Sequence, residues 1–418
     1  MNMKKFIMGI LLLIPNVFWA QIPVNNIFKK AKEQYTQMLQ VATNPSKPPR
    51  TTKDGKLVTV PDIYDWTSGF FAGNLWYTYE ATKDSNLKKA AINFTEALKP
   101  LKDFTGHHDL GFMMYCSYGN AYRLTKNEQY KDILIQTANS LSTRFSEKTG
   151  CIKSWNKRLS WDGKTTWYFP VIIDNMMNLE LLFFASTITG NNKYRDIAIK
   201  HAETTLKNHL RPDYSSYHVI NYDTATGVAL NKETCQGYAD NSTWARGQAW
   251  GIYGFTVVYR ETGDKKFLDA AINMANFYLN NKNIPADNIP IWDLNVNEPG
   301  YTPLWKYDPN SFKTIPRDAS AAAIIASALL ELQGYTTQYA KIFNIAANNI
   351  LNSLSSVRYL SEVGQNGNFL LKHSVGSIPH NSEIDVPLVY ADYYYLEALS
   401  RLKNNSSKLN KYNISTAK

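Results

Sequence analysis

The chain has 418 residues, of which 44% are hydrophobic, 19% charged and 13% aromatic. This balance excludes a disordered, charge-rich protein and supplies enough apolar surface for a large core. The formal net charge of +10 favours acidic partners. No compact block of Lys and Arg resembles a nucleic-acid-binding arm, so nucleic acid is not an expected partner. The composition indicates no oligomeric state.

Residues 1–20 have the pattern of a cleaved secretory signal peptide. Lys4 and Lys5 precede an apolar run from Phe6 to Ile14, and the segment ends at Ala20. The run is too short to span a bilayer, so no membrane partner is expected. The sequence therefore predicts a periplasmic or secreted protein whose mature part, residues 21–418, is a single domain.

Motifs for metals and nucleotides are missing from the sequence. It has no HExxH, P-loop or GxGxxG motif. Cys116, Cys151 and Cys235 are too few and too scattered for a disulfide scaffold or a zinc site, so we interpret them as buried small residues. We expect neither a cofactor nor a metal ion, and metal-independent activity.

A helical hairpin recurs along the chain. Each unit has an aromatic-rich helix, a short polar turn and a second helix that runs through Ala. The units begin at Leu75, Tyr118, Leu179, Tyr253 and Ala328, with a final half unit from Ala391. The turns TKDSN, TKNEQ, TGNNK and TGDKK contain Gly, Asn or Asp where one helix ends and the next begins.

With an N-terminal helix near Ile27 to Leu39, the hairpins give about twelve helices, enough for an all-α fold, an (α/α)6 barrel. An open helical solenoid is the competing arrangement. Long aromatic-rich and Gly-rich segments at 154–170, 214–243 and 284–316 favour closure, because they suit loops that roof a central funnel.

Carboxylates precede several of the inner helices, whose N-termini gather at one mouth of such a barrel. For Asp318 and Asp392 we favour the structural interpretation, an N-cap that accepts backbone N–H groups. Asp109 in GHHDLGFM and Asp174 in FPVIIDNMMN have apolar and aromatic flanks that suit a functional site better. Enzymes that act on sugars by acid and base catalysis commonly use two carboxylates in an aromatic cleft, where one stays ionised and keeps the other protonated.

Several of these motifs together resemble glycoside hydrolase family 88, the unsaturated glucuronyl hydrolases. They are WTSGFFAGNLWYTYE, HHDLGFMMYCSYGNAYRLT, IIDNMMNLELLFFAS, TCQGYADNSTWARGQAWGIYGF and NSEIDVPLVYADYYYLEAL. The resemblance covers roughly Ile27 to Leu402 and implies an (α/α)6 barrel without a metal. It also implies hydration of the C4=C5 double bond that a polysaccharide lyase leaves on a glucuronyl residue.

The resemblance implies roles for individual residues. Asp174 matches the proton donor and later base, and Asp109 matches the second essential carboxylate, which orients the sugar and keeps the pKa of Asp174 high. The substrate-contacting positions, with Trp66 and Trp250 as ring-stacking residues, are Trp66, His218, Thr234, Gln236, Arg246 and Trp250. Cys235 departs from the family pattern, where His is expected in many members.

The substrate is less sharply indicated. The positive charge favours acidic oligosaccharides from heparin-like or chondroitin-like chains, with ulvan products next, and the segment 373–387 is the expected loop for reading the neighbouring sugar. Two alternatives stay open: an unsaturated rhamnogalacturonyl hydrolase with the same double-bond chemistry, and a non-catalytic glycan-binding protein.

Overall fold

The computed structural model describes residues 22–415, with side chains to residue 405; the expected signal peptide lies outside the described residues. Its α-helices are α1 (Val24–Val41), α2 (Phe70–Thr82), α3 (Ser85–Glu96), α4 (Asn120–Thr125), α5 (Glu128–Ser142), α6 (Leu179–Thr189), α7 (Asn192–His209), α8 (Ala245–Thr262), α9 (Lys265–Leu279), α10 (Ala319–Leu332), α11 (Ala340–Leu354) and α12 (Val389–Ser415). A π-helical segment, η2 (Gly111–Gly119), leads into α4, and a 3₁₀ segment, η3 (Ile173–Asn178), leads into α6. No helix within this range is both long and apolar enough to cross a membrane.

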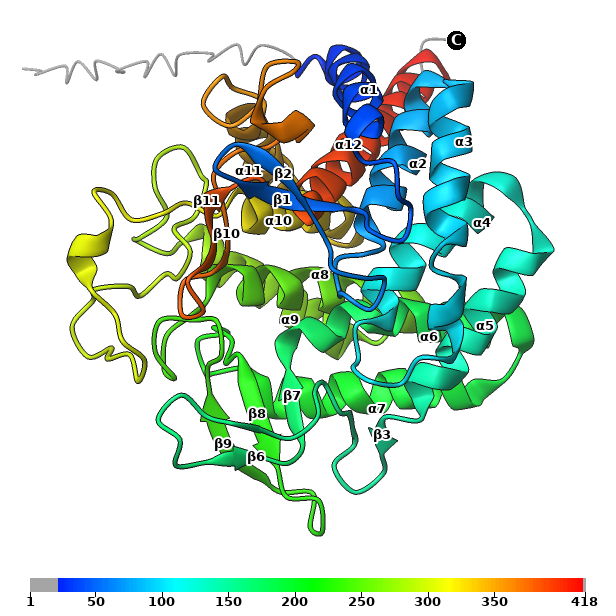
Figure 1. Cartoon of the computed structure of the whole chain (residues 1–418). Coiled ribbons are helices and arrows are strands. Elements are labelled where there is room, and N and C mark those ends of the chain that lie inside the picture. Colours follow the sequence, from blue (N-terminus) through cyan, green and yellow to red (C-terminus); the bar gives the residue numbers. More distant parts are fainter. Residues whose placement is uncertain (1–21, 416–418) are drawn as a thin grey trace, which may run out of the picture.

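The inner helices form a closed ring. Around it, α2 contacts η2, η2 contacts η3 and α6, η3 contacts α8, α8 contacts α10, and α10 contacts α12. The contact between α12 and α2 closes the circle, which an open solenoid would lack. The helices α1, α3, α5, α7, α9 and α11 pack outside this ring (Figure 1). The fold is the predicted (α/α)6 barrel.

The tips of four hairpins share one backbone design. Gly190 and Gly263 end α6 and α8 in the left-handed region, with φ of 69° each, and Asn191 and Asp264 then cap the next helix with their side chains. A left-handed residue followed by a capping side chain reverses the chain within two residues. Lys83 after α2 and Lys126 after α4 adopt the same conformation, with φ of 58° and 57°.

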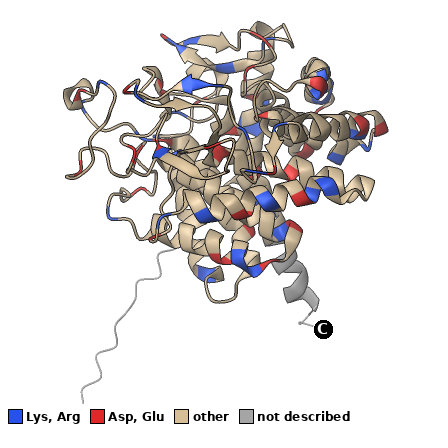
Figure 2. Cartoon of the chain, turned by 90° about the horizontal axis from the view of Figure 1, so that it is seen from below, with Lys and Arg blue, Asp and Glu red and all other residues tan. Residues whose placement is uncertain are grey.

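The core lies between the two layers of helices. In α10 nearly every residue is buried, because this Ala-rich helix packs against α8, α11 and α12 at once. One cluster of buried hydrophobic residues runs from Ile22 to Leu399 and includes every inner helix. Lys and Arg are interspersed with Asp and Glu along the helices in Figure 2.

The two predicted N-caps have different outcomes. Asp318 caps α10 and accepts hydrogen bonds from the backbone N–H groups of Ser320 and Ala321, as predicted. The prediction for Asp392 is wrong, because this residue lies inside the first turn of α12. Its carboxylate accepts instead from the backbone of Leu370 and Leu371 and so holds a distant loop against the helix.

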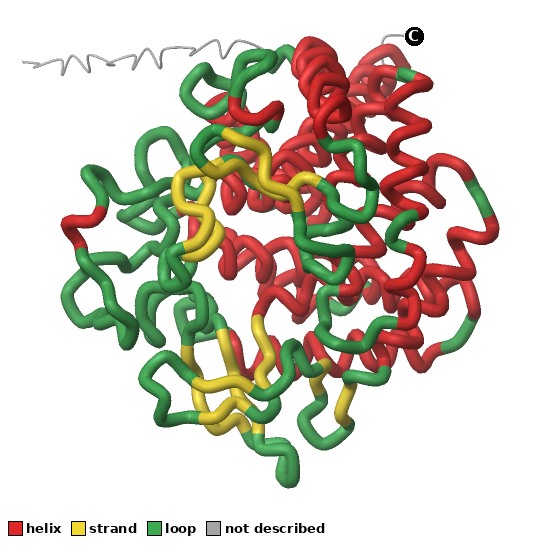
Figure 3. Tube along the Cα trace, viewed as in Figure 1, coloured by secondary structure: helices red, strands yellow, loops and turns green. Residues whose placement is uncertain are grey.

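The loops contain short strands that the sequence interpretation missed. Helices fill one side of the molecule, whereas strands and loops gather on the other (Figure 3). β7, β8 and β9 form a three-stranded antiparallel sheet, and the other strands pair in twos. The strands are β1 (Pro49–Lys53), β2 (Lys56–Thr59), β3 (Phe145–Ser146), β4 (Cys151–Ile152), β5 (Arg158–Leu159), β6 (Thr166–Trp167), β7 (Pro170–Ile172), β8 (Val219–Tyr222), β9 (Ala229–Glu233), β10 (Ser374–Ser377) and β11 (Ser382–Val386).

Candidate active site

A cavity of about 400 Å³ lies where the starts of the inner helices meet the loops. Segments before α2, η2, η3, α8 and α12 all contribute to its wall, so the mouth predicted from the repeats exists. Its lining includes Arg50, Trp66, Asp109, Trp155, Arg158, Ile172, Asp174, Cys235, Gln236, Arg246, Gly376, Ser377, His380, Ser382, Glu383 and Tyr390.

Asp174 lies in the first turn of η3, and close packing between two inner segments sets its position. Gly111 at the start of η2 approaches Asn178 so closely that a Cβ atom would lie 2.4 Å from the Asn178 Cα, which only glycine tolerates. The Asn178 Oδ1 accepts the backbone N–H of Phe112 at 3.1 Å and ties η3 to η2. The start of η2, which follows Asp109, is thereby held against the end of η3, which carries Asp174.

The Asp174 carboxyl is buried, and its Oδ2 atom has no hydrogen-bond partner. The pKa of Asp174 is raised to about 7, mainly by burial; Arg246 opposes this shift and the charge of Asp109 contributes to it. Because removing a carboxylate from water disfavours its charged form, this group holds a proton near neutral pH. Asp174 can therefore act as an acid when protonated and as a base afterwards.

Two histidines, His107 and His108, keep the Asp109 carboxyl group ionised. His107 Nδ1 lies 3.0 Å from one carboxylate oxygen, and His108 Nε2 lies 3.3 Å from the other. Burial raises the pKa of Asp109, but the two histidines outweigh it, so the pKa lies below its usual value. Burial lowers the pKa of His108 to about 4, so we assign the ionised state of Asp109 mainly to its contact with His107. The site thus pairs a protonated and an ionised carboxyl group.

His218 presents a fixed tautomer to the acid. Its Nδ1 accepts the backbone N–H groups of Cys235 and Gln236 at 3.1 and 3.2 Å, so the hydrogen of the neutral ring is on Nε2. Burial lowers the pKa of His218 well below its usual value and keeps the ring neutral. Nε2 lies 3.8 Å from the Asp174 Oδ2, too far for a direct hydrogen bond. From this position the Nε2–H group can donate to an oxygen atom of a water molecule or ligand that also contacts the Asp174 carboxyl.

Arg246 on α8 is almost completely buried and already engaged. Its Nη1 donates to Asp318 at 2.8 Å and to the carbonyl of Val375, and its Nη2 donates to the carbonyl of Gly376 at 2.6 Å. These contacts fasten the β10–β11 hairpin to the barrel. Three of its five N–H groups thus have partners, and the Nε–H and one Nη2–H remain available to a ligand in the cavity that Arg246 lines.

The other predicted contact residues divide into two groups. Trp66 and Gln236 line the cavity. Thr234 and Trp250 are buried behind its wall, where Thr234 accepts the backbone N–H of Gly237 and Trp250 packs between Phe112 and Tyr394. The fully buried Trp250 offers no ring face for stacking, contrary to our expectation. Its indole N–H instead lies close enough to Asp174 to lower that pKa slightly.

Four further residues line the cavity although they were not predicted as site residues: Arg50, Trp155, Arg158 and Tyr390. Arg50 in β1 binds Glu383 in β11 at 2.6 Å and so joins two loop hairpins across the mouth. Arg50 and Arg158 lie in short strands far from any helix start, where no periodic pattern marked them. Trp155 could have been found from the sequence, because it is an aromatic residue in the segment 154–170 that was expected to cover the funnel.

Several buried polar atoms without partners lie in or next to the wall of this cavity. Besides the Asp174 Oδ2, they include His218 Nε2, Trp250 Nε1, Arg246 Nε and Tyr390 Oη. Buried polar groups normally have a hydrogen-bond partner, so this cluster suits a ligand that supplies donors and acceptors of its own. Among residues 22–405, no group of three or more His, Cys, Asp and Glu side chains has an arrangement that could hold a metal ion. An acid and an ionised carboxylate in one polar, aromatic cavity define an enzyme for acid and base chemistry on a sugar.

Comparison with known proteins gives the family. The model of glycosyl hydrolase family 88 matches residues 41–406, and the chain belongs to this family of enzymes. An unsaturated glucuronyl hydrolase from Formosa agariphila is 49% identical over 341 residues, which cover 81% of this chain and 80% of that protein. A solved unsaturated glucuronyl hydrolase specific for heparin is 46% identical with a TM-score of 0.84, covering 92% of this chain and 98% of the other.

A more distant solved structure carries a ligand. It is an Asp-to-Asn variant of the unsaturated glucuronyl hydrolase from Streptococcus agalactiae in complex with dGlcA-GalNAc6S. That protein is 30% identical, with a TM-score of 0.75 and 92% of both chains covered.

Proposed function

We propose that this enzyme removes the unsaturated (4-deoxy-4,5-ene) glucuronyl residue from the non-reducing end of lyase-generated acidic oligosaccharides, by hydrating the C4=C5 double bond. The observation that carries the proposal is the carboxyl pair: Asp174 with a pKa of about 7 and an unpartnered oxygen, and Asp109 ionised, in one cavity. Hydration of an enol ether needs a proton donor first and a base for water second, and Asp174 can serve in turn as both.

In the proposed reaction, the Asp174 carboxyl protonates C4 while positive charge develops toward C5. Water then gives one proton to the Asp174 carboxylate and forms the new bond to C5. His218 Nε2–H helps to hold that water beside the carboxylate, since its position suits a shared oxygen atom. The resulting hemiketal opens by breaking the bond between C5 and the ring oxygen, and the hemiacetal left at C1 releases the rest of the oligosaccharide.

Asp109 has a separate role in this proposal. Its negative charge favours the protonated state of Asp174 and stabilises positive charge on the sugar ring. The largest support for the Asp174 pKa is still burial, so Asp109 adds to an elevation that the cavity itself creates. Its contacts with His107 and His108 hold the carboxylate in one orientation toward the sugar.

For the substrate, we favour fragments of sulfated, heparin-like chains, followed by chondroitin-like fragments. The similarity to the heparin-specific structure at 46% identity supports this order, and the chondroitin disaccharide hydrolases among its relatives are 32–33% identical. The rhamnogalacturonyl alternative has no such support. We also propose that residues 1–20 direct the enzyme to the periplasm or the medium.

The test is turnover of unsaturated disaccharides, made by lyases from heparin, chondroitin and pectin. Activity removes the ultraviolet absorbance of the conjugated double bond, and a reaction in D₂O places one deuterium at C4, which NMR detects. Release of the second sugar without deuterium at C4 would indicate ordinary glycoside hydrolysis and contradict the mechanism. Activity confined to the pectin-derived substrate would support the rhamnogalacturonyl alternative.

A further inference from the structure

Arg158 is a cavity-lining cation whose observed partners carry no negative charge. It lies in β5, which pairs with β6 in a short loop hairpin, and its side chain lines the cavity. Arg158 takes part in none of the ion pairs among residues 22–405, since no carboxylate oxygen in this range lies within 4.0 Å of its guanidinium. A half-buried guanidinium without a counter-ion is unusual, because burial favours pairing.

The contacts that Arg158 does make fix its position. Its Nη1 donates to the Cys235 sulfur at 3.1 Å, its Nη2 lies 3.4 Å from His380 Nε2, and its plane lies near the rings of Trp155 and Trp167. Each of these partners is neutral, so they orient the guanidinium without cancelling its charge. A guanidinium has five N–H donors, so most remain available to a ligand.

His380 completes the arrangement. Because Arg158 can only donate, His380 Nε2 must accept, which puts the hydrogen of the neutral ring on Nδ1, 2.6 Å from the Ser377 hydroxyl. Burial and the Arg158 charge keep the pKa of His380 below its usual value, which maintains this neutral state. A protonated His380 would repel Arg158, so the pair is stable only while the ring is neutral.

We infer that Arg158 binds a sulfate group on the sugar that follows the unsaturated residue, and that it sets the preference of the enzyme for sulfated substrates. Cys235 lies between Arg158 and the catalytic acid: its sulfur accepts a hydrogen bond from Arg158, and the charge of Asp174 contributes to raising its pKa. The reacting ring occupies the Asp174 side, so the next sugar extends toward Arg158 and His380. A guanidinium matches the oxygen geometry of a sulfate ester or sulfamate. The inference rests on the proposed function.

The experiment compares kcat/KM for three heparin-type disaccharides: one without sulfate, one with 6-O-sulfate and one with N-sulfate on the second sugar. For the Arg158→Gln variant we expect the value for the preferred sulfated substrate to fall about 10-fold to 100-fold, the worth of a charged hydrogen bond. The value for the unsulfated substrate should stay nearly constant. The sulfated disaccharide whose kcat/KM falls toward that of the unsulfated one shows which sulfate Arg158 binds.

Matched variants separate charge from folding. Lys157→Gln removes the same charge from the neighbouring, exposed residue, which lies over Tyr168, and should leave all three values unchanged. Arg158→Lys keeps the charge and should recover part of the sulfate preference. Thermal unfolding of each variant checks the fold.

Equal losses on sulfated and unsulfated substrates would overturn the inference, because Arg158 would then bind the glucuronyl carboxylate or shape the cavity. No loss on either would overturn it as well. Failure of the wild-type enzyme on all three disaccharides, together with the chondroitin-derived one, would instead refute the proposed function. Binding of inorganic sulfate, followed by tryptophan fluorescence, tests the anion site in that case: weaker binding by Arg158→Gln than by wild type supports it, and equal binding overturns it.

Discussion

The two ends of the barrel both bury carboxylates, but only the loop-covered end leaves one of them without a hydrogen-bond partner on one oxygen. At the loop-covered end, the Asp174 Oδ2 has no partner and the pKa of this group rises to about 7. At the opposite end, where the inner helices finish, Glu180, Glu331 and Glu397 line or adjoin a second cavity, and every one of them contacts Arg.

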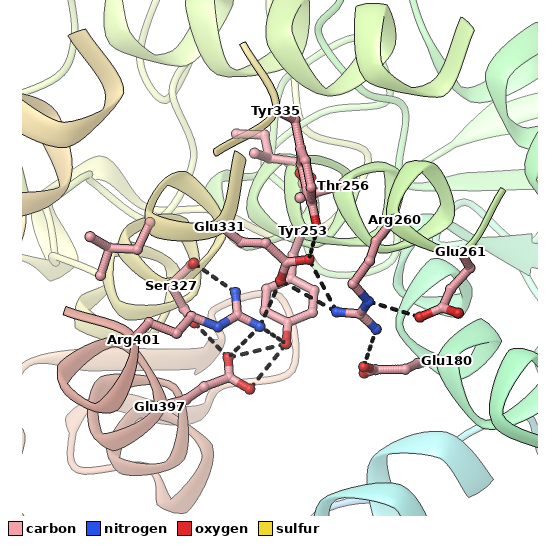
Figure 4. A network of polar contacts seen from close by, with 12 residues as sticks. Glu180, Tyr253, Thr256, Arg260, Glu261, Ser327, Glu331, Tyr335, Glu397 and Arg401 are labelled. Carbon is pink, nitrogen blue, oxygen red and sulfur yellow. Dashed lines mark hydrogen bonds and ion pairs between the residues drawn. The ribbon is translucent and has the colours of Figure 1, made fainter. Parts of the chain in front are cut away.

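The network at that opposite end joins several inner helices (Figure 4). Arg260 on α8 bridges Glu180 on α6 and Glu331 on α10, and Arg401 on α12 contacts the same Glu331 at 2.9 Å. Glu397 accepts hydrogen bonds from Tyr77, Tyr253 and Ser327 as well. The side chains that line this second cavity include no buried polar atom without a partner.

The difference separates two uses of a buried charge. A fully partnered network fixes the spacing of the helices and leaves no group to react. An unpartnered carboxyl costs stability, but it keeps a proton that can move. Residue type alone does not distinguish the two ends, since both have acids, arginines and tyrosines; partnering does.

The sharpest way to break the comparison is Asp174→Asn. The amide keeps the shape of the side chain but has no transferable proton, so turnover should fall by at least about 10²–10⁴-fold, the usual worth of acid and base catalysis. Substrate binding should largely persist, and the unfolding midpoint should not fall. Absorbance assays and calorimetric binding measure the two effects. Turnover within tenfold of wild type would show that another group supplies the proton.

The corresponding change at the opposite end is Glu397→Ala, with the reverse outcome. Arg401 keeps its contact with Glu331, but the hydroxyl groups of Tyr77, Tyr253 and Ser327 lose their acceptor, and we expect a loss of about 1–3 kcal/mol in the free energy of unfolding. Turnover per folded molecule should stay close to wild type at low temperature. Urea unfolding measures the loss. The control is Lys282→Ala, which breaks an exposed ion pair and should change neither quantity. A Glu397→Ala variant that stays stable but loses activity would contradict a purely structural role.

The barrel was predictable from the sequence, because hairpins repeat and each repeat carries helical spacing and a turn. The same holds for Asp109 and Asp174, since residues at the starts of parallel inner helices must meet at one mouth. Asp392 was misassigned because its position near a helix start suggested a cap, whereas its partners are the backbone groups of residues 370 and 371, which only the folded chain brings near.

The loop-borne part of the site could not be predicted in this way. Arg50 and Arg158 lie in strands of two to five residues, too short to show alternation. The stacking role expected for Trp250 came from the family resemblance, whereas the residue pattern itself favoured a core aromatic. Whether a ring is exposed depends on Phe112 and Tyr394, which belong to other helices.

A change at the second acid sharpens the comparison through pH. Asp174 must be protonated to act, so activity should fall as pH rises through about 7. Asp109→Asn removes a negative charge that opposes ionisation of Asp174, so its pKa should drop and the alkaline limb of kcat/KM should move to lower pH. The movement should be smaller than the full elevation, because burial is the main cause. A limb that stays in place or moves upward would assign Asp109 to positioning alone.

The smallest effect concerns the turns at the partnered end. Gly190 has φ of 69° and open space around the position of a Cβ atom, so Gly190→Ala adds backbone strain without a clash. A non-glycine residue in this conformation costs about 1 kcal/mol, and we expect that loss in the free energy of unfolding, with activity unchanged. Gly263→Ala should repeat it, since the turn after α8 has the same geometry. Gly334→Ala is the control, because Gly334 also has open space but no positive φ. Equal stability of all three variants would mean that these turns relax at no cost. Loss of stability in Gly190→Ala and Gly263→Ala but not in Gly334→Ala would show that the turns at this end require a left-handed backbone, just as its buried charges require partners. The loop-covered end differs, because there polar groups without partners face a cavity that can take a ligand.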